Sequence, residues 1–81
     1  MLAEAERELA ATLRLNPNQA DSYANLGHIH FQRKKWKQAI ESFSLAIALG
    51  TDKPDTYYFS GLARVRRKAY LKAIPFLPPG T

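Results

Sequence analysis

The chain has no cysteine and no long apolar run, and these two absences exclude whole classes of protein. Without cysteine there are neither disulfide bonds nor thiolate zinc sites. A transmembrane helix needs about 20 consecutive apolar residues, and no segment reaches that length. The first six residues lack the cationic and then apolar layout of a secretory signal. We therefore expect a cytoplasmic protein or a piece of a longer chain, without a membrane partner.

Catalytic and metal-binding patterns are also missing from the sequence. There is no arrangement of serine, histidine and acid for nucleophilic catalysis, and no glycine-rich phosphate loop. His28 and His30 are two residues apart, whereas paired metal ligands on a helix need a spacing of three or four. We expect no enzymatic activity, no metal and no cofactor.

What the sequence does contain is an internal repeat. Gly27 and Gly61 stand 34 residues apart, and the residue types around them return in the same register. The matching pairs are Tyr23 and Tyr57, Trp36 and Tyr70, Ala39 and Ala73, and Ile40 and Ile74. A repeat of this length is one supersecondary unit that buries its apolar face by stacking on neighbours.

Apolar residues recur at the three-and-four spacing of helices, and no segment alternates with period two. The spacing predicts helices over about 2–15, from Asn18 as an N-cap to about Arg33, over 36–49 and from Pro54 to about Lys68. Gly50 is expected as a left-handed C-terminal cap. Because the connections are short, successive helices should lie antiparallel in an all-α fold.

Two segments carry a resemblance to a known family. Tyr23-x-x-Leu26-Gly27-x-x-His30, followed by Ala39-x-x-x-Phe43-x-x-Ala46, resembles the signature of the tetratricopeptide repeat (TPR). The resemblance implies one domain, 1–81, built as a short solenoid of antiparallel helix pairs. In it, 1–17 is the second helix of a partial repeat, 20–53 is a complete repeat, and 54–81 is a degenerate repeat with a proline-rich end.

The sequence departs from the TPR pattern at several positions. His30 stands where tyrosine is usual, and Ser60 and Arg64 replace a leucine and an aromatic residue in the degenerate repeat. Small residues remain where two helices of a pair should cross, at Gly27 with Ala39 and again at Gly61 with Ala73. Phe43 and Trp36 are expected to fill the space between repeats.

The resemblance implies a protein-interaction scaffold in which the first helices line a concave, peptide-binding groove, as in chaperone-like TPR proteins. The expected groove residues, beside Asp21 and Asp55, are Asn25, His28, Phe31, Gln32, Tyr58, Phe59, Leu62, Val65 and Arg66. The alternative is that Phe59, Leu62 and Val65 pack under a following helix or another copy. A carboxylate clamp is not expected, because Asp55 and Phe59 stand where lysine and arginine are needed.

Basic residues form two runs one repeat apart, which account for most of the net charge of +5. The resemblance places both runs at the turns within helix pairs, on one basic edge made by Arg33, Lys34, Lys35, Arg67 and Lys68. This edge would bind nucleic acid or an acidic partner, or else would simply be solvated, which is the favoured alternative.

Both ends of the predicted array are apolar and open. Leu2, Leu9 and Leu13 lack a preceding helix, and Pro75 interrupts the last expected helix, leaving Ile74, Phe76 and Leu77 without partners. With only 81 residues to form a core, these ends favour a homo-oligomer. A structural oligomerisation unit is therefore a third candidate function.

Overall fold

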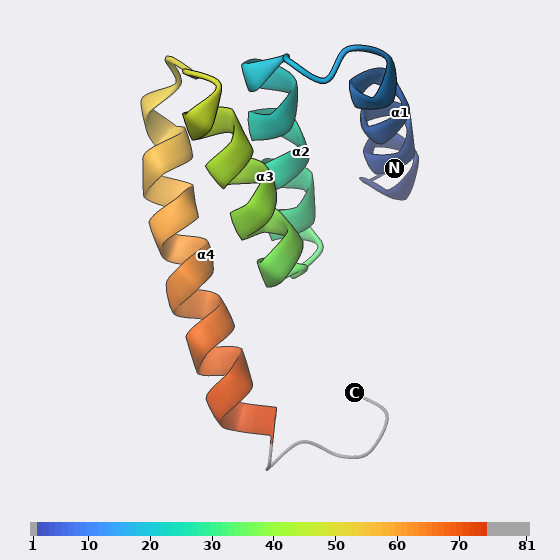
Figure 1. Cartoon of the computed structure of the whole chain (residues 1–81). Coiled ribbons are helices and arrows are strands. Elements are labelled where there is room, and N and C mark those ends of the chain that lie inside the picture. The colour runs from blue at the N-terminus through green and yellow to red at the C-terminus, as the bar shows by residue number, and fades with distance from the viewer. Residues whose placement is uncertain (1, 75–81) are drawn as a thin grey trace.

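The computed structural model describes residues 2–74, and this part of the chain is entirely helical apart from its connections (Figure 1). It contains α1 (Leu2–Leu15), α2 (Ala20–Gln32), α3 (Trp36–Ala48) and α4 (Pro54–Ala73). The prediction of an all-α fold is confirmed for these residues. The predictions for Pro75, Phe76 and Leu77 lie outside them. No helix among the described residues has the length and apolar character to cross a bilayer.

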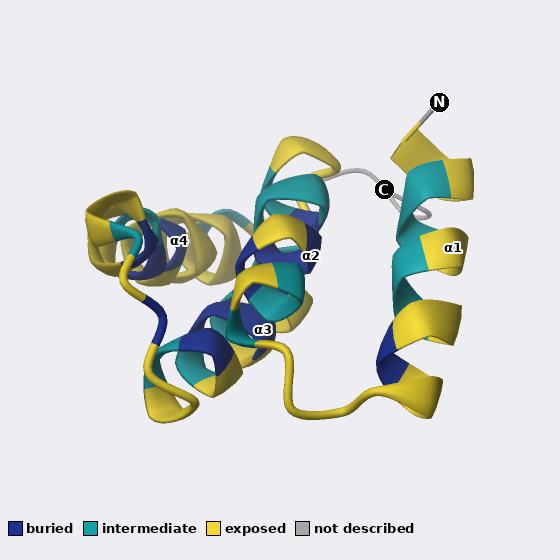
Figure 2. Cartoon of the chain, turned by 90° about the horizontal axis from the view of Figure 1, so that it is seen from above, coloured by how far each residue is buried: buried dark blue, intermediate teal, exposed yellow. Residues whose placement is uncertain are grey.

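The helices follow one another as neighbours, each against the next along the chain (Figures 1 and 2). α2 and α3 make the most extensive contact, α4 packs on α3 and reaches α2, and α1 packs on α2. Short connections force this antiparallel order, since a few residues cannot carry the chain across the molecule.

Two helices end in the same left-handed turn, although only one of them ends in glycine. After α3, Gly50 has φ +84°, and the N–H groups of Gly50 and Thr51 donate to the carbonyls of Ile47 and Ala46. After α2, Lys34 has φ +59°, and the N–H groups of Lys34 and Lys35 donate in the same pattern. Both are Schellman caps. The prediction for Gly50 is confirmed, and Lys34 adopts a conformation that favours glycine.

The start of α2 differs from the prediction. Gln19, not Asn18, is the N-cap residue, and no side chain caps the helix. The Gln19 side-chain oxygen instead accepts a hydrogen bond of 2.7 Å from the Ser22 hydroxyl. The predicted start of α4 is confirmed, because Pro54 opens its first turn, where a missing N–H costs nothing.

The core is centred on Phe43 of α3, which is fully buried with Ala39 and Ala63. A side chain on Gly27 of α2 would meet the Phe43 ring, with an added Cβ only 2.6 Å from its Cδ1 atom. Gly27 therefore lets the α2 backbone lie against the aromatic ring, in agreement with the prediction of a close approach at this glycine. Trp36 is half-buried and packs edge-on against Phe31.

Helix α4 continues well past the predicted end near Lys68. It runs for 20 residues without a turn to Ala73, so that prediction is wrong. Between Leu62 and Ala73 there is no glycine or proline to break it, and alanine, arginine, lysine and leucine are good helix formers. Gly61, expected at a second crossing, has no atom within 4 Å of an added Cβ and lies open.

Helix α1 lies at the edge of the molecule, beside α2 (Figure 2). The prediction that its leucines lack a partner within the chain is wrong for Leu13, which is buried. Leu9 is half-buried, whereas Leu2 is exposed and Leu15 is 83% exposed. α1 therefore has only a narrow buried stripe.

Candidate functional site

The first candidate surface is an aromatic face shared by α2 and α4, made by His28, Phe31, Tyr58 and Phe59. Phe59 lies at its centre, with ring centroids 4.8 Å from His28, 5.4 Å from Phe31 and 5.1 Å from Tyr58, all edge-to-face. This is a preferred arrangement of aromatic pairs. Side chains from two helices that are not consecutive thus form one surface.

Polar contacts link the same two helices at one end of the aromatic face. The Lys53 ammonium donates to the Asn25 side-chain oxygen at 3.2 Å, and His28 Nε2 lies 3.6 Å from Asp55 Oδ2. Asn25 and Asp55 are exposed, and His28 and Lys53 are half-buried, so the contacts contribute little stability. They set the position of the carboxylate and the amide beside the aromatic rings.

The predicted groove residues differ widely in burial. Phe31 and Phe59, both expected in the groove, pack against the buried core formed by Ala39, Phe43 and Ala63. Tyr58 and Val65 are 65% and 64% exposed. His28 and Leu62 are half-buried, whereas Asn25, Gln32 and Arg66 are exposed.

A second cluster joins α1 to the end of α2 and surrounds Glu6. The Lys35 ammonium donates to both Glu6 carboxylate oxygens, at 3.0 and 3.3 Å, and the Arg33 guanidinium donates to Oε2. His30 Nδ1 lies 3.1 Å from Glu6 Oε1 but makes no hydrogen bond. Sequence reasoning did not identify this cluster, because nothing in the local pattern pairs residues 27 and 29 positions apart.

The Glu6 cluster alters the ionisation of two groups. Burial raises the pKa of Glu6, but the hydrogen bond from Lys35 and the charges of His30, Lys35 and Arg33 outweigh it and lower the pKa overall. Burial is the main reason that the pKa of His30 is lowered. The Glu6 carboxylate raises this pKa, and the charges of Lys35 and Arg33 lower it. The lowered pKa favours the neutral form of His30 at neutral pH, so its approach to Glu6 becomes an ion pair only in acid.

The predicted basic edge does not form as one surface at two equivalent turns. Arg33 and Lys35 face Glu6 of α1, and Lys34 is exposed in the turn after α2. Arg67 and Lys68 lie within α4, where the chain makes no turn. The prediction is wrong because it depended on a break in α4.

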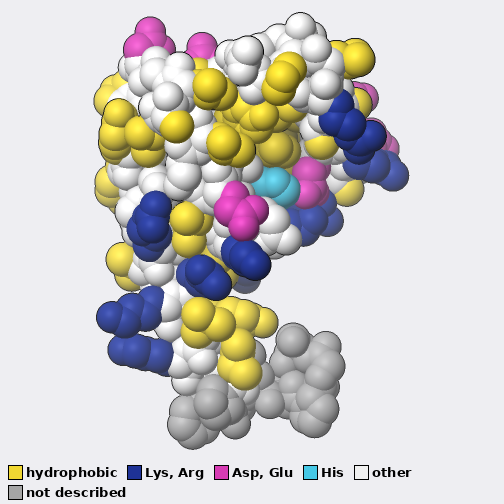
Figure 3. Space-filling view, viewed as in Figure 1, with side chains coloured by type: hydrophobic (Ala, Val, Ile, Leu, Met, Phe, Trp, Pro, Cys, Tyr) yellow, Lys and Arg dark blue, Asp and Glu magenta, His cyan; other side chains and the backbone are white. Residues whose placement is uncertain are grey.

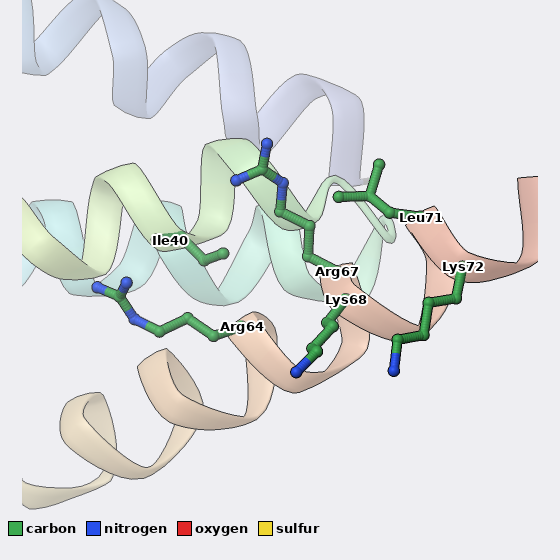
Figure 4. A pocket seen from close by; sticks show the side chains of 6 residues that line it. All are labelled: Ile40, Arg64, Arg67, Lys68, Leu71 and Lys72. Carbon is green, nitrogen blue, oxygen red and sulfur yellow. The ribbon is translucent and has the colours of Figure 1, made fainter.

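Arg67 and Lys68 instead line an open hollow between α3 and α4, which we call the α3–α4 hollow (Figure 4). Its volume is about 380 Å³, and its lining is Ile40, Arg64, Arg67, Lys68, Leu71 and Lys72. Lys and Arg side chains lie beside hydrophobic ones over the projecting part of α4 (Figure 3). Arg64 makes one long contact, of 3.4 Å, with the Ser44 hydroxyl.

Within residues 2–74 no three histidine or acidic side chains lie together as a metal site would require. Comparisons with known protein families, with curated proteins and with solved structures found no significant match to this chain.

Proposed function

We propose that the chain is a protein-interaction module of the TPR type that binds a peptide or helical segment of a partner on the aromatic face. The antiparallel succession of helices and the close approach of Gly27 to Phe43 support the TPR-type array. The observation that carries the proposed function is the exposure of Tyr58 beside rings anchored in the core, with Val65 exposed seven residues further along the same helix.

The aromatic face has the properties of a binding surface. Burying an exposed large apolar side chain contributes about 1.5–3 kcal/mol, and tyrosine is frequent at the energetic centres of interfaces. Tyr58 rests on Phe59, which packs against the core. This support reduces the freedom that Tyr58 would lose when a partner covers it.

The polar groups beside the rings would orient the bound segment. Asp55 and Asn25 offer side-chain oxygens, and His28 and Lys53 offer donors, at the end of the aromatic face. A partner segment would bury apolar side chains against Tyr58 and Val65 and exchange polar contacts at this end. The three-helix carboxylate clamp remains disfavoured, because Asp55 and Phe59 occupy two of its positions.

Two neighbouring tyrosines provide the test. Peptides selected from a random display library against the purified chain would be measured by fluorescence anisotropy on Tyr58→Ala and on Tyr57→Ala. Tyr57 is 59% exposed, but successive helical residues point about 100° apart, so it serves as a matched control. We expect Tyr58→Ala to weaken binding about tenfold, equivalent to about 1.4 kcal/mol, and Tyr57→Ala to weaken it less than about twofold.

The proposal fails if both tyrosine variants bind the selected peptides as the parent does, or if both lose affinity equally. A display selection that yields no peptide would also contradict it. Circular dichroism of each variant controls for loss of fold.

A further inference from the structure

The second half of α4, residues 64–73, which we call the projecting half, runs alongside the start of α3 and then beyond it. α4 has 20 residues and α3 has 13, so at 1.5 Å per residue α4 is longer by about 10 Å. The end of α4 extends beyond the α2–α3 pair (Figure 1). This extension is ordered as helix, yet no other described helix covers it.

The uncovered surface continues the buried stripe of α4. Thr56, Ser60 and Ala63 are buried on the side of α4 that packs on α3. Steps of three and four residues lead from Ala63 through Arg67 to Leu71 and Ile74, which therefore lie on the same side. Leu71 is 49% exposed and Ile74 is 44% exposed. The first half of this face is covered by a helix, and the second half is apolar and open.

The charge of this surface has one sign. Five cations lie between positions 64 and 72, and no acidic residue lies between 56 and 74. None of these cations forms an ion pair within the described part of the chain. The lining of the α3–α4 hollow contains four of the five and no carboxylate. An occupant with acidic groups would therefore meet cations that have no carboxylate partner among the described residues.

We propose that the α3–α4 hollow and the projecting half of α4 bind an acidic amphipathic helix of a partner protein. Apolar side chains of that helix at intervals of three and four would pack on Ile40, Leu71 and Ile74. Glutamate or aspartate side chains on its flanks would pair with Arg64, Arg67, Lys68 and Lys72. The stripe through Arg67, Leu71 and Ile74 faces away from Tyr58, and Val65 lies between the two, next to Lys68 and Lys72. The inference rests on this stripe and its cations and makes no use of the aromatic face.

The shape and chemistry of the surface favour a helix over other anionic partners. α3 covers the first half of the α4 stripe. A partner helix on the open second half would lie end to end with α3. From Arg64 to Ile74 the surface runs for about 16 Å, or three helical turns. Nucleic acid would pair with the cations but would offer no apolar side chains to Ile40 and Leu71.

The test uses synthetic peptides and two matched pairs of variants. The probe is a 14-residue helical peptide with leucine at intervals of three and four and glutamate on the flanks. One control peptide carries lysine for glutamate, and another carries serine for leucine. We expect the acidic, leucine-containing peptide alone to bind the full chain in fluorescence anisotropy.

Neighbouring positions on α4 provide the variants and their controls. Arg67→Glu and Leu71→Ser should each weaken binding of the acidic peptide about tenfold or more, because they remove a pairing cation and an apolar contact. Arg66→Glu makes the same change of charge away from the stripe and should weaken binding less than about threefold. Val65→Ser removes an apolar side chain next to Lys68 and Lys72 but about 120° around the helix from Leu71, and should weaken binding less than Leu71→Ser does. Tyr58→Ala should leave this binding unchanged. Circular dichroism verifies the helicity of every variant.

Several results would overturn the inference. Equal losses in Arg67→Glu and Arg66→Glu, or equal binding of the serine-containing peptide, would indicate a diffuse attraction between opposite charges. Tighter binding to phosphatidylserine vesicles or to a short RNA duplex than to the peptide would assign the surface to those partners. Sedimentation showing a dimer that Leu71→Ser dissociates and Val65→Ser does not would make a second copy the occupant.

Discussion

The contact between Gly27 and Phe43 predicts opposite effects for the same substitution at the two equivalent glycines. An alanine Cβ at position 27 would lie 2.6, 2.7 and 3.0 Å from three atoms of the Phe43 ring. Carbon atoms in contact are normally about 3.5–4.0 Å apart, so the overlap approaches about 1 Å. Phe43 is fully buried, and its ring has little room to move away.

The expected magnitude follows from two opposing contributions. Overfilling a packed core costs about 1–3 kcal/mol, and the size of the overlap favours the upper end. Alanine is a better helix former than glycine by about 1 kcal/mol. Gly27→Ala should therefore destabilise the fold by about 2 kcal/mol, which lowers Tm by about 8–16 °C in a domain of this size. Gly27→Leu should destabilise it further.

Gly61→Ala is the matched control, because an added Cβ there meets nothing within 4 Å. Only the gain in helix propensity remains, so stability should rise by about 1 kcal/mol. Urea and thermal unfolding followed by circular dichroism measure both changes. An unaltered or stabilised Gly27→Ala protein would refute the account of the core. A destabilised Gly61→Ala protein would mean that another helix covers Gly61.

Three further predictions concern the helix ends and the Glu6 cluster. Glu6→Gln should lower the unfolding free energy by about 1–2 kcal/mol in urea titration, because Arg33 and Lys35 lose a charged acceptor; an unchanged midpoint would contradict this. Because the pKa of His30 is lowered in the folded chain, the unfolded chain binds the proton more readily, and stability should fall as the pH drops below 6.5, the usual pKa of histidine. The lowered pKa of Glu6 should add a further loss of stability below pH 4.5. His30→Gln should remove the part of this pH dependence that begins at 6.5, and an identical dependence in that variant would exclude His30 as its source. Lys34→Gly should raise Tm by an amount equivalent to about 0.5–1 kcal/mol by relieving the positive φ, and a lower Tm would show that the lysine conformation is unstrained.

The helices that could be predicted from the sequence are those whose signals are local. The apolar spacing of 36–49 and the cap at Gly50 predict α3 well, because both act within a few residues. The continuation of α4 was missed because the repeat register favoured a turn near Lys68, although no residue there breaks a helix. Local helix propensity prevailed over the periodicity of residue types.

The surfaces were less predictable than the helices. Phe59 packs against the core because α4 lies close to α2 and α3. The spacing of residues in the sequence does not determine how closely these helices approach. The contacts of Glu6 depend in the same way on the packing of α1 against α2. The excess of cations after position 63 is visible in the sequence. Because α4 continues without a turn, these cations line the α3–α4 hollow and do not join Arg33 and Lys35 on one edge.

The order in which the helices contact one another has a consequence for how the chain opens. When each helix packs mainly on the next one in sequence, few contacts join distant parts of the chain, and such topologies fold rapidly. Segments at the ends of the row then unfold locally without disrupting the centre. Amide hydrogen exchange should be slowest around Phe43 in α3, faster in α1 and fastest near Ile74. The two ends of the row would therefore sample open states while the α2–α3 pair stays folded.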